Sequence, residues 1–278
     1  MSEVEPNGCA PSDCAGCSSA GNCPSQKQDM RVPGNAQSTI GKVIAVVSGK
    51  GGVGKSLVTA SLARMMREKG YRVGILDADI TGPSIPKMYG IHGTATGSEE
   101  GIFPSIAKDE TRIMSVNLLL EDEDTPVLWR GPVIAGVVTQ FWTDVLWGDL
   151  DYLFVDMPPG TGDVPLTVFQ SLPIDGVVIV TSPQELVQMI VKKAYHMAVQ
   201  MNVPVLGIVE NYSFVTCPDC GKQIFPFGEG KTKEIAEELG IPMLGQIPIS
   251  KELSQAVEEE AFSEVCNEFI QEAFQVIK

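Results

Sequence analysis

The sequence has no long apolar run and no excess of basic residues. No apolar stretch approaches the roughly 20 residues that span a bilayer, and the acidic segment Met1–Asp13 has no apolar core like that of a secretory signal. Lysine and arginine number 20 against 35 aspartates and glutamates, for a net charge of -15. A polyanion binds phosphate backbones and anionic membranes poorly. We therefore expect a cytoplasmic protein whose partners include neither nucleic acid nor a membrane.

Histidine is also scarce, while cysteine is present in two groups. His92 and His196 are the only histidines, and neither lies at a spacing typical of metal ligands. Seven cysteines in a reducing compartment are better explained as metal ligands or core residues than as disulfides.

The chain divides by composition near residue 37. Residues 1–37 are rich in Gly, Ser, Pro, Asn and Cys and have almost no aliphatic residues, which predicts a flexible, metal-binding tail. Residues 38–278 alternate short aliphatic runs with helical patterns, which predicts a single α/β domain: a doubly wound, mostly parallel sheet flanked by helices. The expected strands are Lys42–Ser48, Arg72–Leu76, Tyr152–Val155, Gly176–Val180 and Pro204–Val209, and the expected helices are Lys55–Lys69, Pro132–Trp147, Val164–Leu172 and Gln184–Met201.

A phosphate-binding motif connects the first expected strand to the first helix. Its sequence matches G-x-x-x-x-G-K-[ST] in the strand–loop–helix context that such a loop requires. Glycines let backbone N–H groups approach phosphate oxygens, the lysine neutralises the β- and γ-phosphates, and the serine hydroxyl binds Mg²⁺. These residues predict an ATP site: Gly49, Lys50, Gly51, Gly52, Val53, Gly54, Lys55 and Ser56.

Acidic residues follow two other expected strands. Asp77-Ala78-Asp79 comes after one strand, and Asp156 begins the loop Asp156–Asp163 after another. Ligands of such sheets bind at the carboxyl ends of the strands. We assign Asp156 to Mg²⁺ and Asp79 to the attacking water or to Mg²⁺, so that Lys50, Lys55 and Asp79 form the catalytic set. An isolated aspartate at a strand end is more often a helix cap, but three coinciding motifs favour the nucleotide site.

The additional lysine, Lys50, is unnecessary for ordinary phosphate binding. The run Gly49–Ser56 resembles the deviant P-loop of the MinD/ParA/nitrogenase-iron-protein class. In that class this lysine reaches the nucleotide of the other subunit. The resemblance implies that a nucleotide-bound homodimer is the active unit.

The first cysteine group lies in the tail, with the spacing C-x4-C-x2-C-x5-C: Cys9, Cys14, Cys17 and Cys23. Four thiolates suffice for zinc or for a [4Fe–4S] cluster, and the spacing leaves both open.

The second cysteine group is the pair Cys217 and Cys220 in Cys217-Pro218-Asp219-Cys220-Gly221. One chain offers two ligands here, whereas a symmetric dimer offers four on its two-fold axis. A disulfide or thioredoxin-like redox pair is the alternative. Cys266, in an apolar helical stretch, is better explained by packing.

Taken together, these motifs resemble the Mrp/ApbC family of iron–sulfur carrier ATPases over roughly residues 38–278. The resemblance implies that Cys217 and Cys220 hold a labile bridging [4Fe–4S] cluster, that the cluster is delivered to apo-proteins, and that ATP affects the dimer. It also aligns Asn211 with the residue that contacts adenine, and it places Leu57 beside the nucleotide where many relatives have a small hydroxyl residue. The resemblance is carried by Ser48–Ser56, Asp77–Ser84, Trp129–Pro132, Asp156–Asp163, Thr181–Gln184 and Glu210-Asn211 followed by Cys217–Cys220.

The tail resembles that of the eukaryotic cytosolic scaffold subgroup, which implies a second, more stable [4Fe–4S] cluster. In that subgroup the gap between the first two cysteines is longer than the four residues between Cys9 and Cys14. This departure puts the ligand role of Cys9 in doubt.

Three other functions compete with cluster delivery: a positioning ATPase of the MinD/ParA type, ATP-gated electron transfer and a zinc-bridged regulatory module. A MinD-type ATPase would need a basic amphipathic C-terminal helix, but Glu258–Lys278 is acidic, and a ParA-type ATPase would need a basic DNA-binding surface. ATP-gated electron transfer, as in the nitrogenase iron protein, uses ligands from two separated loops rather than one C-x2-C. A zinc-bridged regulatory dimer stays open, because thiolate spacing does not identify the metal.

Overall fold

The computed structural model describes residues 30–79, 82, 84–120, 131–183, 187–265 and 268–278. Its main sheet has eight strands in the order β12-β9-β8-β1-β7-β2-β6-β5, and only β5 runs antiparallel to its neighbour. The strands of this sheet are β1 Thr39–Ser48, β2 Val73–Asp77, β5 Ser105–Ile106, β6 Arg112–Ser115, β7 Asp149–Asp156, β8 Gly176–Thr181, β9 Val205–Glu210 and β12 Met243–Gln246. The predicted doubly wound, mostly parallel sheet is confirmed.

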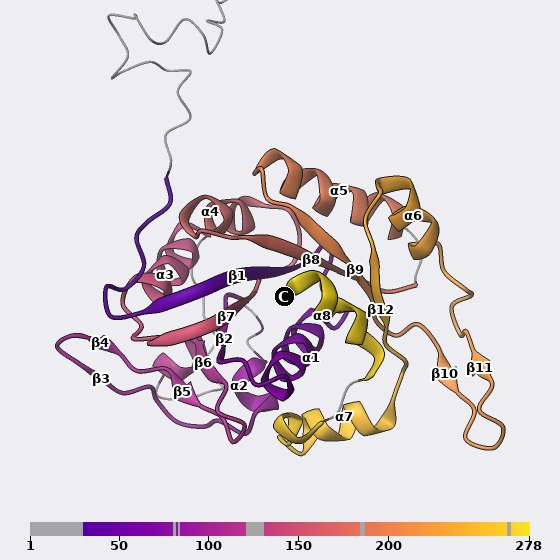
Figure 1. Cartoon of the computed structure of the whole chain (residues 1–278), viewed down its shortest axis with the longest axis horizontal. Helices are drawn as coiled ribbons and strands as arrows, with labels where there is room; N and C mark the ends of the chain where they lie inside the picture. The colour runs from indigo at the N-terminus through magenta and orange to yellow at the C-terminus, as the bar shows by residue number, and fades with distance from the viewer. Residues whose placement is uncertain (1–29, 80–81, 83, 121–130, 184–186, 266–267) are drawn as a thin grey trace, which may run out of the picture.

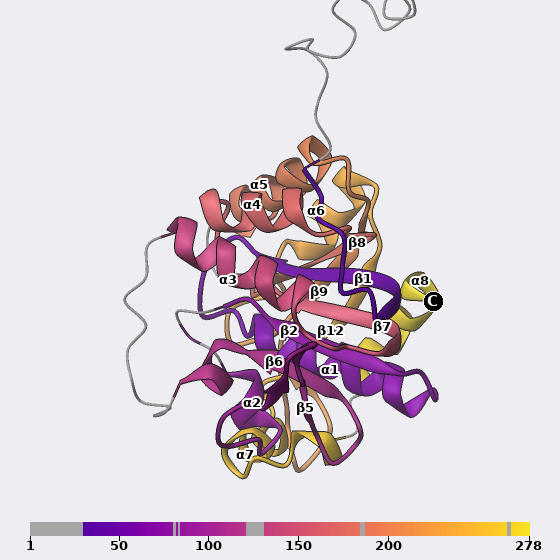
Figure 2. The ribbon, with the colours of Figure 1, turned by 90° about the vertical axis from the view of Figure 1, so that its left-hand side faces the viewer.

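Helices cover both faces of the sheet, as Figure 2 shows from the side. One layer holds α3 Gly131–Thr143, α4 Asp163–Ser171, α5 Val187–Gln200 and α6 Thr232–Leu239, and the other holds α1 Lys55–Glu68, α2 Ile85–Met88, α7 Lys251–Glu258 and α8 Gln271–Ile277. Side chains of β1 alternate between the two cores: Val43 and Ala45 belong to one, Ile44 and Val46 to the other. This period of two explains why a strand buried on both faces has a continuous apolar sequence.

Smaller elements lie outside these layers. Two hairpins are formed by β3 Gly97–Ser98 with β4 Gly101–Ile102 and by β10 Val215–Thr216 with β11 Gln223–Ile224. The second projects from the body of the molecule, at the lower right of Figure 1. Short 3-10 helices are η2 Val116–Leu119, η3 Phe262–Glu264 and η4 Glu268–Ile270.

The predicted helix over 132–147 ends early, at Thr143. Beyond that point the chain pairs with the β3–β4 hairpin: Ile102 N donates to Asp144 O, and Leu146 N donates to Ile102 O. Tertiary hydrogen bonds therefore replace the last turn that the apolar pattern predicts.

The part of the chain before β1 packs on the domain where it is described. Val32 N donates to Ser171 O, and Trp142 Nε1 donates to Val32 O. The division into a tail of residues 1–37 and a domain of residues 38–278 stays a prediction. Within the described ranges, no helix is both long enough and apolar enough to cross a membrane.

Candidate functional site

Parallel pairing brings the carboxyl ends of several strands to one edge of the sheet. In the register of the sheet, Asp77 at the end of β2 lies opposite both Asp156 on β7 and Ser115 on β6. The P-loop leaves β1 at the same edge, since Val46 pairs with Asp156. The sheet therefore gathers the motifs that the sequence separates by about a hundred residues.

Glycines shape the P-loop in two different ways. Gly52 and Gly54 have φ of 76° and 77°, in the left-handed region that favours glycine. A Cβ on Gly51 or Gly52 would meet nothing within 4 Å, so this side of the loop is open to a phosphate. At the loop entry the constraint is packing, because a Cβ on Gly49 would lie 2.2 Å from Cγ2 of Ile190 on α5.

Lys55 begins α1 and lies between two carboxylates. Its Nζ is 2.9 Å from Asp156 Oδ1 and 3.4 Å from Asp79 Oδ2, and Lys55 is only 6% exposed. Burial alone would lower the pKa of Lys55, but the charges of Asp156 and Asp79 outweigh it and raise the pKa above its ordinary value. The ammonium is therefore held charged at the point where the motif requires a cation.

Asp156 is fully buried and accepts hydrogen bonds from α1. The hydroxyl of Ser56 lies 2.6 Å from Asp156 Oδ2, and that of Thr59 lies 2.7 Å from Asp156 Oδ1. A serine hydroxyl beside a carboxylate forms the hard oxygen donor set that Mg²⁺ prefers. The residues present thus fit the magnesium site expected of the motif.

Asp77 is the second buried carboxyl group of the site. Ser115 Oγ donates to its Oδ2 at 3.1 Å, and the backbone N–H of Asp79 donates to its Oδ1 at 3.1 Å. Burial and the neighbouring charge of Asp156 raise the pKa of Asp77 well above its usual range. The hydrogen bond from the Asp79 backbone to Asp77 helps to fix the position of Asp79.

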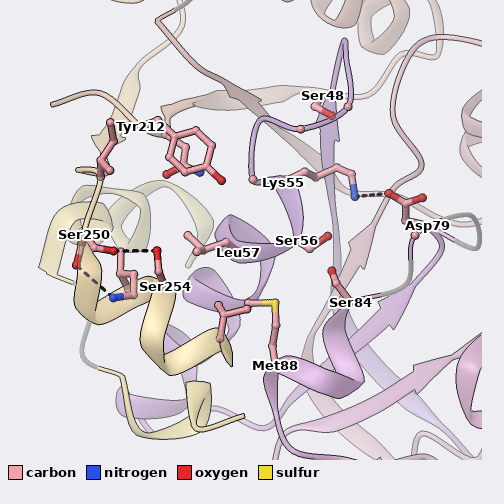
Figure 3. Close-up of a pocket in the computed structure, with 18 of the residues that line it drawn as sticks. Ser48, Lys55, Ser56, Leu57, Asp79, Ser84, Met88, Tyr212, Ser250 and Ser254 are labelled. Atoms are coloured by element: carbon pink, nitrogen blue, oxygen red, sulfur yellow. Dashed lines mark hydrogen bonds and ion pairs between the residues drawn. The ribbon is translucent and has the colours of Figure 1, made fainter. Parts of the chain in front are cut away.

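Asn211, after β9, packs directly on the P-loop. Its side-chain Nδ2 donates to Val53 O at 3.0 Å, and a Cβ on Gly54 would lie only 2.0 Å from the same nitrogen. The next residue, Tyr212, has φ of 58°, an uncommon conformation for a bulky residue. In Figure 3 its ring points toward Lys55 and the P-loop.

A cavity of about 490 Å³ adjoins these groups (Figure 3). The P-loop forms one wall, Tyr212 and Ile249 another, and Met88 with α7 the third. Leu57, expected beside the nucleotide, is half-buried and lines this cavity. Lys50 is half-buried on the loop between Gly49 and Gly51. The cavity brings together these predicted residues: Gly51, Gly52, Gly54, Lys55, Ser56, Leu57, Asp79 and Asn211.

Cys217 and Cys220 lie at the turn of the β10–β11 hairpin. Cys217 N donates to Lys222 O, and Gly221 N, at a φ of 71°, donates to Cys217 O, both at 2.9 Å. Cys217 is half-buried, Cys220 is exposed, and both are free thiols. The turn therefore presents both sulfurs at the surface.

The turn also favours the thiolate of Cys217. Backbone N–H groups of Asp219 and Cys220, with a smaller contribution from the Cys220 thiol, lower the pKa of Cys217 below its ordinary value. Thiolate is the form that binds metals.

The described ranges hold no group of three or more His, Cys, Asp or Glu placed to share a metal ion. Within those ranges the hairpin thus offers two thiols and no third side chain of these kinds placed to share a metal ion with them. Cys9, Cys14, Cys17, Cys23 and Cys266 lie outside the described residues.

Sequence reasoning missed two polar contributors. Thr59 lies one helical turn after Lys55, so its hydroxyl reaches the same carboxylate, and this spacing was the available signal. Glu210, which the sequence analysis named only as part of a motif, is buried beside Asn211 and binds the hydroxyls of Ser213 and Thr232; the motif gave no indication of these contacts.

A family model described as the NUBPL iron-transfer P-loop NTPase matches residues 39–278. The iron-sulfur cluster carrier protein of Methanocaldococcus jannaschii is 47% identical over 250 residues, covering 87% of this chain and 86% of that one. The protein of the same name from Clostridium perfringens is 45% identical over 260 residues, covering 88% and 91%.

Solved structures agree with the fold. A nucleotide-binding protein of Archaeoglobus fulgidus, in complex with ADP and with cobalt, is 43% identical with a TM-score of 0.76, covering 86% of this chain and 93% of that one. The cell-division protein MinD of Aquifex aeolicus, 18% identical with a TM-score of 0.56 over 85% and 93%, shares the fold. The chain belongs to the NUBPL iron-transfer P-loop NTPase family.

Proposed function

We propose that this protein is a cytoplasmic ATPase that carries iron–sulfur clusters to apo-proteins. As a homodimer, it would hold one [4Fe–4S] cluster between its subunits. Relatives at 47% and 45% identity are named iron-sulfur cluster carrier proteins, which supports the cargo. The observation that carries the proposal is the pair of surface thiols, Cys217 and Cys220, on a chain that also has a P-loop site.

The number of ligands supports a shared cluster. A [4Fe–4S] cluster takes four thiolates, and the hairpin of one chain supplies two. A two-fold axis through the hairpin would bring Cys217 and Cys220 of each subunit together. Because these thiols lie on an exposed turn rather than in a core, the cluster would be accessible to a recipient protein.

ATP is proposed to bind at the P-loop with Mg²⁺. Lys55 would contact the β- and γ-phosphates, while Ser56 and Asp156 would hold Mg²⁺, which neutralises phosphate charge when bound. Asp79 would orient the attacking water, and Asn211 would contact the base.

The additional P-loop lysine supports a dimeric active unit. Lys50 lies on the P-loop beside the cavity wall formed by Gly51. It is proposed to act on the partner's nucleotide and, with Lys55 and Asp79, to support hydrolysis.

Cys9, Cys14, Cys17 and Cys23 are proposed to bind a second cluster, with zinc as the alternative. This part of the proposal rests on their spacing alone.

The test is anaerobic purification and reconstitution, followed by counting iron, sulfide and zinc per chain. The wild type is compared with a Cys217→Ala/Cys220→Ala variant. The expected result is iron and sulfide in the wild type and loss of one cluster per dimer in the variant, with a weakened dimer in sedimentation. Stoichiometric zinc without sulfide in both proteins would instead indicate a zinc-containing regulatory ATPase.

Coupling to ATP is tested with Lys55→Ala. This variant should keep its hairpin cluster and lose nucleotide-dependent transfer to an apo-protein. Normal transfer by Lys55→Ala would show that nucleotide is not coupled to delivery.

A further inference from the structure

A buried carboxylate, Glu210, ends β9 directly before Asn211, and it is 1% exposed. Its Oε1 accepts hydrogen bonds from Ser213 Oγ at 2.6 Å and Gln246 Nε2 at 3.0 Å, and its Oε2 accepts one from Thr232 Oγ1. Hydrogen bonds to a charged acceptor are strong, and in a buried network they are costly to leave unmade. Glu210 therefore holds these partners in fixed positions.

Two of these partners bracket the cysteine hairpin. Ser213 precedes the segment 214–231, and Thr232 follows it as the first residue of α6. Each hydroxyl binds a different oxygen of the same carboxylate, so a single side chain closes the base of the segment. Within the segment, the rings of Phe214 and Phe225 lie 5.9 Å apart, and they join the base to the residue that follows β11.

On its other side, the same stretch of backbone contacts the P-loop. Asn211 donates from its side chain to Val53 O and from its backbone to Thr181 O at 2.8 Å. Its Nδ2 also occupies the space that a side chain on Gly54 would take, so Asn211 packs directly against this part of the P-loop. Adjacent residues of one strand end thus hold the nucleotide loop and the thiol hairpin.

Phosphate binding requires the P-loop contacts to change. Lys55 is paired with Asp156 and Asp79, and Ser56 is bonded to Asp156. To contact phosphate and Mg²⁺, the ammonium and hydroxyl must exchange some of these bonds for new ones. Packed elements shift between discrete arrangements rather than deform continuously, and Asn211 is the residue after β9 that contacts the loop.

We propose that Glu210 is the positioning residue that transmits the nucleotide state of the P-loop to the cysteine hairpin. This inference deepens the proposed function and rests on it for the role of the thiols in cluster binding. The coupling itself concerns only contacts within this chain, so it can be measured without a cluster.

The experiment is hydrogen exchange of the full-length chain, read by mass spectrometry on peptides from 214–231, with and without Mg²⁺ and ATP. In the wild type, nucleotide should change the exchange rates of these peptides by about fivefold or more, the lower range of allosteric coupling. Thr232→Val removes only the hydroxyl that binds Oε2, and Glu210→Gln removes the charge. In both variants the nucleotide-induced change should fall below about twofold while ATP still binds.

The matched controls are Thr143→Val on α3 and Glu238→Gln, whose carboxylate pairs with Lys192 at the surface of α6. Both should keep the full nucleotide-induced change. A purely structural role for Glu210 would raise exchange equally with and without ATP and preserve the ratio, which would overturn the proposal. Exchange rates of the wild-type hairpin that do not change when ATP is added would also overturn the proposal.

Failure of the proposed function is distinguishable from failure of this inference. If reconstitution gives no cluster but Thr232→Val abolishes the ATP response of the hairpin, the coupling stands and the cargo is wrong. If the cluster binds and Thr232→Val retains the full response, the coupling through Glu210 is wrong. Should Glu210→Gln fail to fold, Thr232→Val alone decides, since it keeps the carboxylate and its bonds to Ser213 and Gln246.

Discussion

Lys55 is the central side chain of the phosphate site, and Cys217 is one of the two thiols of the hairpin. The surroundings of these two side chains differ. Lys55 is buried between two carboxylates at the edge of an eight-stranded sheet. Cys217 lies at the turn of a hairpin whose strands are two residues each, beside an exposed Cys220. The phosphate site therefore has a buried charge network within one chain, whereas the hairpin presents two thiols on a short turn. We therefore expect single substitutions to have larger effects at the buried site than at the hairpin.

The largest expected effect comes from removing the buried cation of the phosphate site. Lys55→Ala should lower the rate of ATP hydrolysis by at least about 100-fold, because charge that develops on the phosphates loses its nearest ammonium. Phosphate release measures this effect. Lys192→Ala, which removes a surface partner of Glu238, is the control and should leave the rate unchanged. Hydrolysis by Lys55→Ala within tenfold of wild type would contradict the assigned role.

Substitution of two glycines in the left-handed conformation compares how tightly the P-loop and the cysteine hairpin are packed. Gly54→Ala places a methyl group 2.0 Å from Asn211 Nδ2, whereas at Gly221, with φ of 71°, a methyl group meets nothing within 4 Å. We expect Gly54→Ala to lower the free energy of unfolding by about 2–4 kcal/mol, from strain and overlap together. Gly221→Ala should cost about 1 kcal/mol, from backbone strain alone. Urea denaturation measures both, and equal costs would refute the contrast.

Asp77→Asn tests the electrostatics of the buried site through pH. Because the pKa of Asp77 is raised in the folded state, the native protein binds this proton more tightly than the unfolded chain does. The contribution of Asp77 to stability is therefore present below its unfolded pKa and is lost as pH rises toward the folded pKa. The free energy of unfolding of Asp77→Asn, followed by urea denaturation, should decline less steeply above pH 4 than that of the wild type. Parallel profiles would exclude a buried neutral Asp77, and exposed Asp149→Asn is the control.

The smallest expected effect is at the hairpin. Since the pKa of Cys217 is lowered, its alkylation should begin at lower pH than that of an ordinary thiol. The main donors are backbone N–H groups, so Cys220→Ala should move the alkylation profile of Cys217 only partly toward the ordinary value. Mass spectrometry of the alkylated peptide across pH gives the profile. A complete return to the ordinary value would mean that the Cys220 thiol, rather than the turn, sets the pKa.

The helices and strands differed in how far the sequence could predict them. The expected helix Lys55–Lys69 and the expected strand Gly176–Val180 agree with α1 and β8 to within a residue, because the glycine-rich phosphate motif and continuous aliphatic runs are local signals. The four-residue strands β6 and β12 were not predicted, since both are too short to show periodicity. Their importance comes from what they place, namely Ser115 beside Asp77 and Gln246 beside Glu210.

Within the candidate sites, too, some contacts could be predicted from the sequence and others could not. The P-loop, Asp79 and Asp156 converge on Lys55 as the motif spacing predicts, since strand ends in a parallel sheet share an edge. The closure of the hairpin segment by Glu210 could not be predicted. It depends on hydroxyls 3 and 22 residues away that only the folded chain brings together.

The contact between Gly49 and α5 has a consequence for engineering. A side chain at position 49 would overlap not only the Ile190 side chain but also its carbonyl oxygen, 2.8 Å from the added carbon. The glycine that opens the phosphate motif is thus required by the path of a helix distant in sequence. Grafting this loop onto another sheet would consequently demand a co-transferred helix start, and shortening Ile190 alone would not make position 49 permissive.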